Sequence, residues 1–344
     1  MARHMTGMRV LVTGGAGFIG SELVHQLCQA GATVVVADSL VNGKREHLAG
    51  LPGDRCRLAE VDVRDPEPMA RLLRQTDLVY HLACLGVRHS IHSPLENHEV
   101  NATATLRLLG LARAAGVRRF VHVSSSEVYG TAVRVPMTED HPTAPLTVYG
   151  ASKLAGERYA AAYFHTYGLP TVVVRPFNAY GPRSHHEGDC GEVIPKFLLR
   201  ALAGKPLVVF GDGRQTRDFT YVSDTAAGIL AAGLTEAAVG RTINLGTSTE
   251  VSVTELTRMV AQVVGADRVG VVYHPDRPGD VKRLYADASL AYKLLGFAPT
   301  VTLHAGLSKL RDWYATQPPA ADLLRDERER NWEVSEATLS EVQS

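Results

Sequence analysis

The chain has 344 residues, 45% of them hydrophobic, and its 36 Lys and Arg residues balance 36 Asp and Glu residues. A chain of this length can bury the core of one large domain or of two coupled domains, and a zero net charge gives no electrostatic basis for binding nucleic acid or an anionic membrane surface. Its four cysteines show no CxxC spacing, and no apolar run approaches the roughly 18 residues of a membrane span. We therefore expect a cytoplasmic protein with reduced thiols and no metal site.

The sequence begins with a predicted strand, a glycine-rich turn and a helix. "MRVLVTG" at 8–14 predicts a buried strand, and residues 18–30 predict a helix. The turn "TGGAGFIG" between them has glycines for the tight bend, for close approach of a pyrophosphate and for packing of helix on strand. These are Gly14, Gly17 and Gly20. The pattern predicts a dinucleotide site at the helix N-terminus.

The next predicted strand, 32–38, ends in an acid, Asp38. A carboxylate at this place accepts hydrogen bonds from an adenosine ribose 2′-hydroxyl and repels a 2′-phosphate. It therefore predicts NAD rather than NADP as the cofactor. The structural alternative is that Asp38 is the N-cap of a helix.

Further apolar strands alternate with amphipathic helices. They are predicted at 56–63, 78–83, 120–125 and 171–176. This alternation is typical of an α/β fold with a doubly wound parallel (Rossmann) sheet covered on both faces. We expect residues 8–176 to form an NAD-binding domain.

Two motifs in this half carry chemistry, "SSSEVYG" at 124–130 and "YGASK" at 149–153. Helical spacing places Tyr149 and Lys153 on one face, one turn apart. A phenol of ordinary pKa ~10 is a poor base, but a neighbouring ammonium and an oxidised nicotinamide both favour tyrosinate, so Tyr149 could take a hydroxyl proton while hydride leaves the same carbon. A serine of the first motif, at a strand end, could bind the same oxygen.

After Pro176 the loops become rich in Gly, Pro and charge, which predicts a smaller, interleaved α/β substrate domain. "RTINLG" at 241–246 predicts a strand that returns to the first sheet. The resulting division gives the first domain a returning segment at about 220–247. It gives the substrate domain residues 177–219 and 248–315, and leaves 316–344 as a C-terminal tail.

The motifs also resemble those of one enzyme family when they are read in order. "TGGAGFIG", "VDVRD", "HLAC", "SSSEVYG", "YGASK", "RPFNAYGPR", "GDGRQTRDFTYVSD" and "RPGD" resemble the extended short-chain dehydrogenase/reductases that act on nucleotide sugars. The resemblance covers nearly all of residues 8–315. It implies a nucleoside-diphosphate sugar as substrate, NAD as cofactor, and C4 oxidation to a 4-keto intermediate followed by return of the hydride.

The resemblance implies a role for each matching position. Ser125 is the hydroxyl partner of Tyr149 at the substrate, and Lys153 binds ribose hydroxyls of the cofactor. The nucleotide diphosphate and its ribose are held by Asn178, Arg217, Arg277 and Asp280. The cofactor is contacted by Gly14, Gly17, Phe18, Ile19, Gly20, Asp38, Asp62, Val63, Leu82, Ala83, Cys84, Asn101, Ser124, Tyr149, Lys153 and Pro176.

Ser126 and Glu127 complete the expected catalytic set and bear on the reaction. Simple 4-epimerases of the family carry small or apolar residues there, dehydratases place an acid at Glu127, and some UDP-glucuronate decarboxylases have Ser-Glu. A C4 ketone acidifies the C5 proton, which a carboxylate can remove before water leaves C6. We expect a 4,6-dehydratase, with 4-epimerase (UDP-hexose or UDP-hexuronate type) second and decarboxylase third. A Glu127 carboxylate that only binds loop amides, and a non-catalytic NAD-binding protein, are the remaining alternatives.

Two further expectations concern packing. Cys84 replaces the usual small residue after "HLA" and is interpreted as a core cysteine next to the cofactor. Helices predicted at 94–115 and 147–167 are apolar on more than one face, enough to cover both a sheet and a partner. The family commonly pairs such helices into a four-helix interface, so we expect a homodimer.

Overall fold

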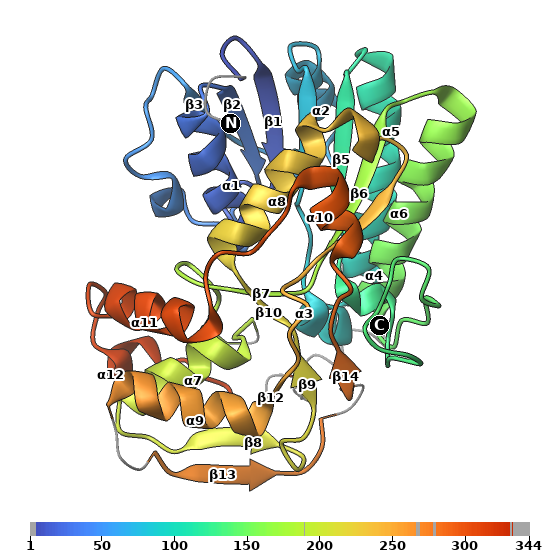
Figure 1. The fold of residues 1–344 in the computed structure, drawn as a ribbon. Coiled ribbons are helices and arrows are strands. Elements are labelled where there is room, and N and C mark those ends of the chain that lie inside the picture. The colour runs from blue at the N-terminus through green and yellow to red at the C-terminus, as the bar shows by residue number, and fades with distance from the viewer. Residues whose placement is uncertain (1–4, 189, 266–268, 278–279, 331, 333–344) are drawn as a thin grey trace, which may run out of the picture.

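The computed structural model describes residues 5–188, 190–265, 269–277, 280–330 and 332. Figure 1 shows a larger unit, built on a central sheet, above a smaller unit of helices and short strands. Residues 331 and 333–344 of the expected tail lie outside the described part. Within the described ranges, no helix is long and apolar enough to cross a membrane.

Seven parallel strands form the central sheet, which confirms the predicted Rossmann-type fold. Apolar residues on both faces of these strands are buried, as expected for a sheet with a helix layer on each side. The strand at 241–246 does return to this sheet, with Ile243 next to Val174. In spatial order the strands are β11 (Thr242–Leu245), β6 (Thr171–Pro176), β5 (Arg119–Val123), β4 (Leu78–His81), β1 (Arg9–Thr13), β2 (Thr33–Asp38) and β3 (Cys56–Glu60).

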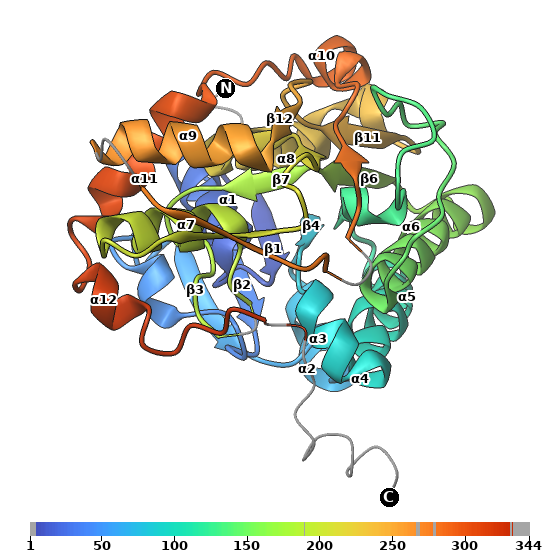
Figure 2. The same cartoon turned by 90° about the horizontal axis from the view of Figure 1, so that it is seen from below.

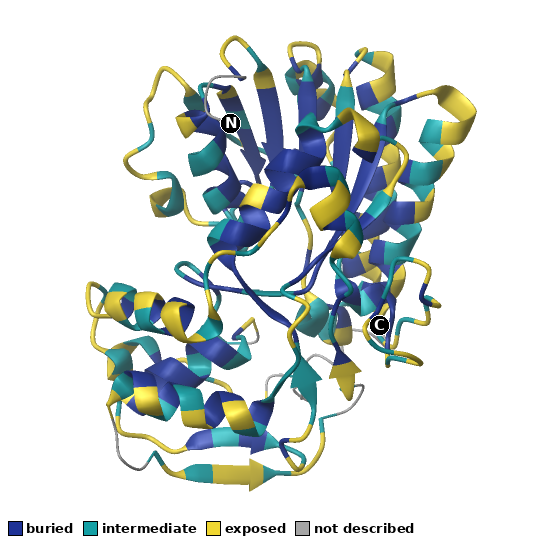
Figure 3. Ribbon diagram, viewed as in Figure 1, coloured by how far each residue is buried: buried dark blue, intermediate teal, exposed yellow. Residues whose placement is uncertain are grey.

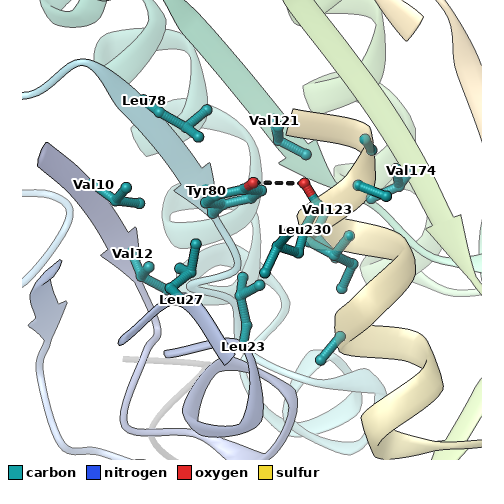
Figure 4. Close-up of a cluster of buried hydrophobic side chains, with 14 of the residues drawn as sticks. Val10, Val12, Leu23, Leu27, Leu78, Tyr80, Val121, Val123, Val174 and Leu230 are labelled. Carbon is teal, nitrogen blue, oxygen red and sulfur yellow. Dashed lines mark hydrogen bonds between the residues drawn. The ribbon is translucent and has the colours of Figure 1, made fainter. Parts of the chain in front are cut away.

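Helices cover the two faces of the sheet and enclose two separate cores, drawn in dark blue in Figure 3. On the first face, the Tyr80 hydroxyl crosses the core and donates a hydrogen bond of 2.9 Å to the Leu230 carbonyl (Figure 4). The first face carries α1 (Phe18–Gln29), α8 (Val222–Leu234) and α10 (Ser289–Leu295), and the second carries α2 (Pro66–Leu73), α5 (Ala104–Ala114) and α6 (Val148–Tyr167).

The helix predicted at 94–115 is interrupted. It consists of α4 (Pro94–His98), a π-helical turn at Glu99–Thr103, and α5. A π-turn adds one residue to the helical repeat and reorients the side chains within it, and such turns are frequent at functional sites. Asn101 lies in this turn, and α3 (Val87–His92) precedes it.

The smaller unit has its own core, formed where α7, α9 and α11 pack together. α9 begins with a reciprocal capping box between Ser252 and Glu255. A parallel pair of strands, β8 and β13, covers the helices. The elements are α7 (Val193–Leu202), β8 (Leu207–Phe210), α9 (Val253–Val264), β13 (Val271–His274), α11 (Leu303–Tyr314) and α12 (Ala320–Leu323).

Short strands connect the two units, because the chain crosses between them several times. β7 pairs with β10 in parallel, and β9 lies between β12 and β14. Their bounds are β7 (Asn178–Tyr180), β9 (Thr216–Arg217), β10 (Phe219–Tyr221), β12 (Val251–Ser252) and β14 (Arg283–Leu284). Single 3-10 turns complete the fold at Arg45–Leu48, Ser126–Val128 and Glu236–Ala238.

Two of the expected boundaries are wrong in detail. The stretch 248–315 is divided, because Ala291, Leu295 and Phe297 pack into the first core against β11 and α8. The stretch from 316 is not only a tail, because α12 packs on α7 and Leu324 enters the second core. In both cases apolar side chains return to a core from a segment with no strong motif.

Candidate functional site

A cleft of about 570 Å³ separates the carboxyl ends of the strands from the smaller unit. Open parallel sheets bind ligands at this edge. Every residue predicted to contact cofactor or substrate lines the cleft, with the exception of Asn101. The fold thus brings residues from 14 to 280 together, although their individual roles stay predictions.

The glycine-rich turn is packed so closely that it has no room for side chains. A phosphate could therefore approach its backbone directly. Gly14 has a φ of +69°, and a Cβ placed on it would lie 2.6 Å from the Ala83 nitrogen. A Cβ on Gly20 would collide with the Gly14 carbonyl oxygen. Glycine is therefore required at both positions, and the N-terminus of α1 opens directly into the cleft.

Asp38 is held by loop amides and caps no helix. Its carboxylate accepts hydrogen bonds from the backbone N–H groups of Ala16 and Leu40, each at 2.9 Å. The next helical turn begins only at Arg45, which removes the N-cap alternative. A carboxylate can accept about four hydrogen bonds, so Asp38 retains capacity for a ribose.

Asp62 and Val63 follow the end of β3 at the cleft edge. Hydrogen bonds from Arg64 to the Asp62 carboxylate, the shortest at 2.7 Å, lower the pKa of Asp62. Asp62 is therefore ionised at neutral pH, and its orientation is fixed by the arginine.

Asn101, which is predicted to contact the cofactor, lies behind the wall of the cleft. Its carboxamide accepts a bond from the Leu85 N–H and donates one to the Leu85 carbonyl, both at 2.9 Å. Both groups of Leu85 are thus satisfied by one buried side chain behind the loop that follows β4. Asn101 therefore positions this loop and does not line the cleft itself.

The serine motif forms a tight turn where β5 ends. Ser125 accepts a bond of 3.2 Å from the Glu127 N–H and begins the 3-10 turn. Among the described residues, the buried Ser124 Oγ has no hydrogen-bond partner, as expected of an atom kept for a ligand.

Tyr149 and Lys153 lie on the first turns of α6, opposite this motif. Thr147 caps the helix by accepting a bond of 3.1 Å from the Gly150 N–H. The buried Lys153 ammonium donates a bond of 2.7 Å to the Val123 carbonyl. This bond holds the helix that carries Tyr149 and Lys153 against the end of β5, and the serine motif follows directly after that strand.

Burial raises the pKa of Tyr149 above its ordinary value, and nearby Cys84 and Glu127 add to the rise. A side-chain hydrogen bond with Ser125 works in the opposite direction but is weaker. Because burial disfavours the charged phenolate, the proton of Tyr149 needs a further cation in the cleft before it can leave readily.

Glu127 faces the substrate side of the cleft. The turn uses its backbone N–H, and among the described residues no hydrogen bond from a loop amide reaches its carboxylate. Burial raises the pKa of Glu127, while the charges of Arg217 and Arg88 lower it. The alternative of a carboxylate that only binds loop amides is thus not supported.

The substrate wall holds both paired and unpaired polar groups. Arg217 donates a bond of 2.7 Å to Asp280, whereas Asp218 accepts bonds from Thr247 and Ser248 and, in the part of the chain that the structure describes, from no arginine. Within the described ranges, the buried Asn178 Oδ1 and Arg277 Nε have no hydrogen-bond partner. These atoms are available for a polar ligand.

Several charged residues of the cleft were not predicted from the sequence, among them Arg88, Glu192 and Lys196. Glu192 is the N-cap of α7 but makes no capping bond, and burial raises its pKa to about 8 although Arg88 lowers it. Burial lowers the pKa of Lys196 to about 8. None of the three belongs to a recognised motif. The sequence offers only one indication: Arg88 lies close after "HLAC", and Glu192 and Lys196 lie close after the glycine-containing loop before α7.

Cys84 is not a core cysteine. Its side chain is exposed and lines the cleft at the end of the "HLAC" loop. Since β4 ends at His81, Cys84 follows the strand by three residues and lies beyond the core.

Comparisons with known proteins agree with this site. The GDP-mannose 4,6 dehydratase family model matches residues 11–310. The UDP-glucose 4-epimerase of Mycolicibacterium smegmatis is 38% identical over 89% of this chain and 98% of its own length. The UDP-glucuronic acid decarboxylase 1 of Xenopus tropicalis is 35% identical over 88% of this chain and 70% of its own.

A solved structure shows the same fold. The dTDP-glucose 4,6-dehydratase of Streptomyces venezuelae, with NAD bound, superimposes with a TM-score of 0.84 at 38% identity, over 90% of this chain and 98% of the other. The family match spans both units of the fold, including the strand ends and the loops that form the cleft. The chain therefore belongs to the GDP-mannose 4,6-dehydratase family, within the extended short-chain dehydrogenase/reductases that act on nucleotide sugars.

Proposed function

We propose that this protein is an NAD-dependent nucleoside-diphosphate-sugar 4,6-dehydratase. The observation that favours this reaction is the Glu127 carboxylate, which lies in the cleft under the influence of Arg88 and Arg217 and has no bond from a loop amide among the described residues. Of the family's reactions, dehydration makes the most use of a base at this position.

The cofactor is NAD, which when bound would supply the hydride acceptor for oxidation at C4 of the sugar and the donor for return of the hydride. The glycine turn and Asp38 would hold the pyrophosphate and the adenosine ribose. Tyr149 would accept the C4 hydroxyl proton while Ser125 binds the same oxygen. Lys153, fixed on the Val123 carbonyl, would bind ribose hydroxyls and supply a positive charge near the phenol.

Two carboxyl groups with different pKa values suit the elimination step. Glu127, with arginines near it, would remove the C5 proton. Glu192 has a pKa of about 8 and keeps its proton at neutral pH, so it could donate that proton to the C6 hydroxyl as it leaves as water. Both lie near Tyr149, whose pKa both raise.

A 4-epimerase is the second candidate, because the UDP-glucose 4-epimerase of Mycolicibacterium smegmatis is 38% identical in sequence over 89% of this chain. Epimerisation needs Ser125, Tyr149 and Lys153 but no C5 base. The sugar would rotate after oxidation and take the hydride on its other face. Decarboxylation of a nucleotide-linked glucuronic acid is the third outcome.

Product masses separate these reactions. The purified protein would be incubated with UDP-glucose, dTDP-glucose, GDP-mannose, UDP-N-acetylglucosamine and UDP-glucuronic acid in deuterated water. We expect loss of water and deuterium at C5. An unchanged mass with inverted C4 would establish the epimerase instead, and loss of carbon dioxide the decarboxylase.

Glu127→Gln tests the base directly, because the amide keeps the size of the side chain and removes its basicity. We expect oxidation at C4 to continue, seen as accumulated NADH absorbance, with little dehydrated product. Glu236→Gln, at an exposed ion pair far from the cleft, is the matched control. Full dehydration by Glu127→Gln would remove the proposed role.

A further inference from the structure

A continuous chain of hydrogen bonds runs behind the cleft, from the glycine-rich turn to the helices on the second face of the sheet. At its centre is His81, the last residue of β4, which is 2% exposed. Its Nδ1 atom lies 2.7 Å from Thr13 Oγ1, at the end of the neighbouring strand β1, and its Nε2 atom lies 2.8 Å from Thr105 Oγ1 in α5. Figure 2 shows α3, α4 and α5 grouped at one side of the molecule, next to α6. His81 therefore connects the strand that carries the glycine-rich turn to this group of helices.

The two ends of the chain determine where its protons lie. At one end the Ala83 N–H group can only donate, and its acceptor is Thr13 Oγ1 at 3.3 Å. At the other end the Asn101 carbonyl can only accept, and Thr105 Oγ1 donates to it at 2.7 Å. The Thr105 hydroxyl has thus used its single proton. Its bond with His81 therefore requires a proton on the Nε2 atom of the imidazole.

His81 is neutral in this environment. Burial, assisted by the charge of Lys153, lowers the pKa of His81 to about 3. The centroid of the His122 ring, whose pKa is also lowered by burial, lies 5.6 Å from that of His81. A neutral imidazole with a proton on Nε2 has a lone pair on Nδ1, so the Thr13 hydroxyl donates to it. Every hydrogen bond of the chain then points in one direction, and bonds aligned in this way strengthen one another.

The chain holds the loop that follows β4, residues 82–86, which lines the cleft. At Ala83 the loop lies so close to the glycine-rich turn that a Cβ on Gly14 would be 2.6 Å from the Ala83 nitrogen. At the other end of the loop, the Asn101 side chain donates a bond of 2.9 Å to the Leu85 carbonyl. The chain thus begins and ends at residues that hold this loop, so its bonds set the position of the loop relative to the glycine-rich turn.

We propose that His81 is a positioning residue for NAD: as the Nε2–H tautomer it joins Thr13 to Thr105 and so fixes loop 82–86 against the glycine-rich turn. Both segments line the cleft and are predicted to contact the cofactor, so a shift of one against the other would cost contacts to NAD. The inference concerns the cofactor alone and does not depend on which sugar reaction follows.

Removal of one hydroxyl from the chain tests this role. Thr105→Val keeps the shape of the side chain but leaves His81 Nε2 without an acceptor. Thr171→Val is the matched control, because the Thr171 hydroxyl is also buried and donates a bond of 2.9 Å to the Ala160 carbonyl, at the start of β6 and away from the cleft. The two valine variants should lose similar amounts of melting temperature.

Calorimetric titration of the full-length, cofactor-free protein with NAD gives the decisive comparison. We expect Thr105→Val to bind NAD about 5- to 100-fold more weakly than the wild type. Thr171→Val should bind NAD like the wild type. Thr105→Ser, which keeps the hydroxyl, should also retain the wild-type affinity.

The tautomer of His81 gives a reading that a loss of stability alone would not change. NMR of the full-length protein with isotope-labelled histidine rings distinguishes the Nε2–H, Nδ1–H and imidazolium forms. The signals absent from His81→Gln identify this residue among the 14 histidines. We expect the Nε2–H form in the wild type from about pH 5 to about pH 8, and a population of the Nδ1–H form in Thr105→Val.

Three results would overturn the positioning role and leave the proposed sugar reaction untouched. The first is an NAD affinity of Thr105→Val equal to that of the wild type. The second is equal weakening of NAD binding by Thr105→Val and Thr171→Val, because the effect would then come from lost stability. The third is an Nδ1–H or charged His81 in the wild type, since the order of protons along the chain would be broken.

Discussion

Arg175 and Glu157 form a buried, two-point ion pair beside the turn at Ser126–Val128, with N–O distances of 2.9 and 2.7 Å. The two side chains are 4% and 3% exposed. Arg175 also donates a bond of 2.7 Å to the hydroxyl of Tyr129, in the same turn as Glu127. The pair therefore joins β6, α6 and the turn that carries the proposed base.

Glu157→Gln should destabilise the protein strongly, because it leaves the Arg175 charge buried and uncompensated. The expected loss is about 3–5 kcal/mol in the free energy of unfolding, measured by urea denaturation. Glu236→Gln breaks an ion pair with Arg119 in which Glu236 is 89% exposed, and should cost less than about 1 kcal/mol. Equal losses in the two variants would contradict this assignment.

Tyr149→Phe should lower turnover by about 10²–10⁴-fold, because the ring remains but cannot accept the C4 hydroxyl proton. NAD affinity should stay near that of the wild type, since Lys153 and the glycine turn are unchanged. Steady-state kinetics and calorimetry measure the two effects. Tyr167→Phe, at the exposed end of α6, is the control, and wild-type rates in Tyr149→Phe would rule out the proposed base.

Asp38→Asn should reduce the ratio of the affinity for NAD to the affinity for NADP. Asparagine can still accept a bond from a loop amide, so the loop keeps part of its support, but the negative charge that repels a 2′-phosphate is gone. Titration of cofactor-free protein with both dinucleotides provides the test. Equal affinity of the wild type for NAD and NADP would refute the role of Asp38.

Glu192→Gln should change the pH dependence of stability in the ligand-free protein. Arg88, Tyr149 and Tyr314 are the charged or titratable groups that interact with this carboxyl. Its pKa is about 8 in the folded state, against an ordinary value of 4.5, so the folded chain binds a proton that the unfolded chain releases. The stability that this proton gives is complete below the unfolded pKa and is lost as the pH rises through the folded one.

The variant carries a neutral amide at every pH and escapes this loss. Its advantage over the wild type in melting temperature should therefore grow from about pH 5 to about pH 9. Glu236→Gln should show no such trend. If the melting temperatures of Glu192→Gln and the wild type changed with pH in parallel, the pKa of Glu192 would not be raised in the folded protein, and the prediction would be wrong.

A homodimer through α5 and α6 is the expected assembly. Apolar side chains remain on their outer faces, among them Leu106 at 38% exposure and Tyr167 at 49%. Light scattering at micromolar concentration should give twice the chain mass, and Leu106→Glu should shift it toward the monomer. Val272→Glu, on the exposed strand β13, should not. A monomeric wild type would contradict the expectation.

Sequence patterns predicted the elements whose signals are local. The glycine spacing predicts the turn after β1 and the start of α1, and the run "TINL" predicts a returning strand because apolar β-branched residues favour a sheet. The interruption of the helix at Glu99–Thr103 was missed, because a π-turn has the same composition as the helix around it.

The site was predictable only where residues belong to a motif. Ser125, Tyr149 and Lys153 belong to motifs with fixed spacing. Arg88 lies in α3 and Glu192 at the N-terminus of α7, so the charge of each acts on the other only because the tertiary fold brings them together.

The pairing of β11 with β6 has a consequence for biosynthesis. β6 leaves the ribosome long before Thr242–Leu245, and until then its outer edge has no partner. Unpaired strand edges can join other chains, and pairings between distant segments form slowly because loop-closure entropy must be overcome first. A nascent chain that ends within α8 would therefore expose β6 to aggregation and to chaperones. The cofactor-binding half cannot complete its sheet during translation until the whole first segment of the smaller unit, residues 177–219, has also been made.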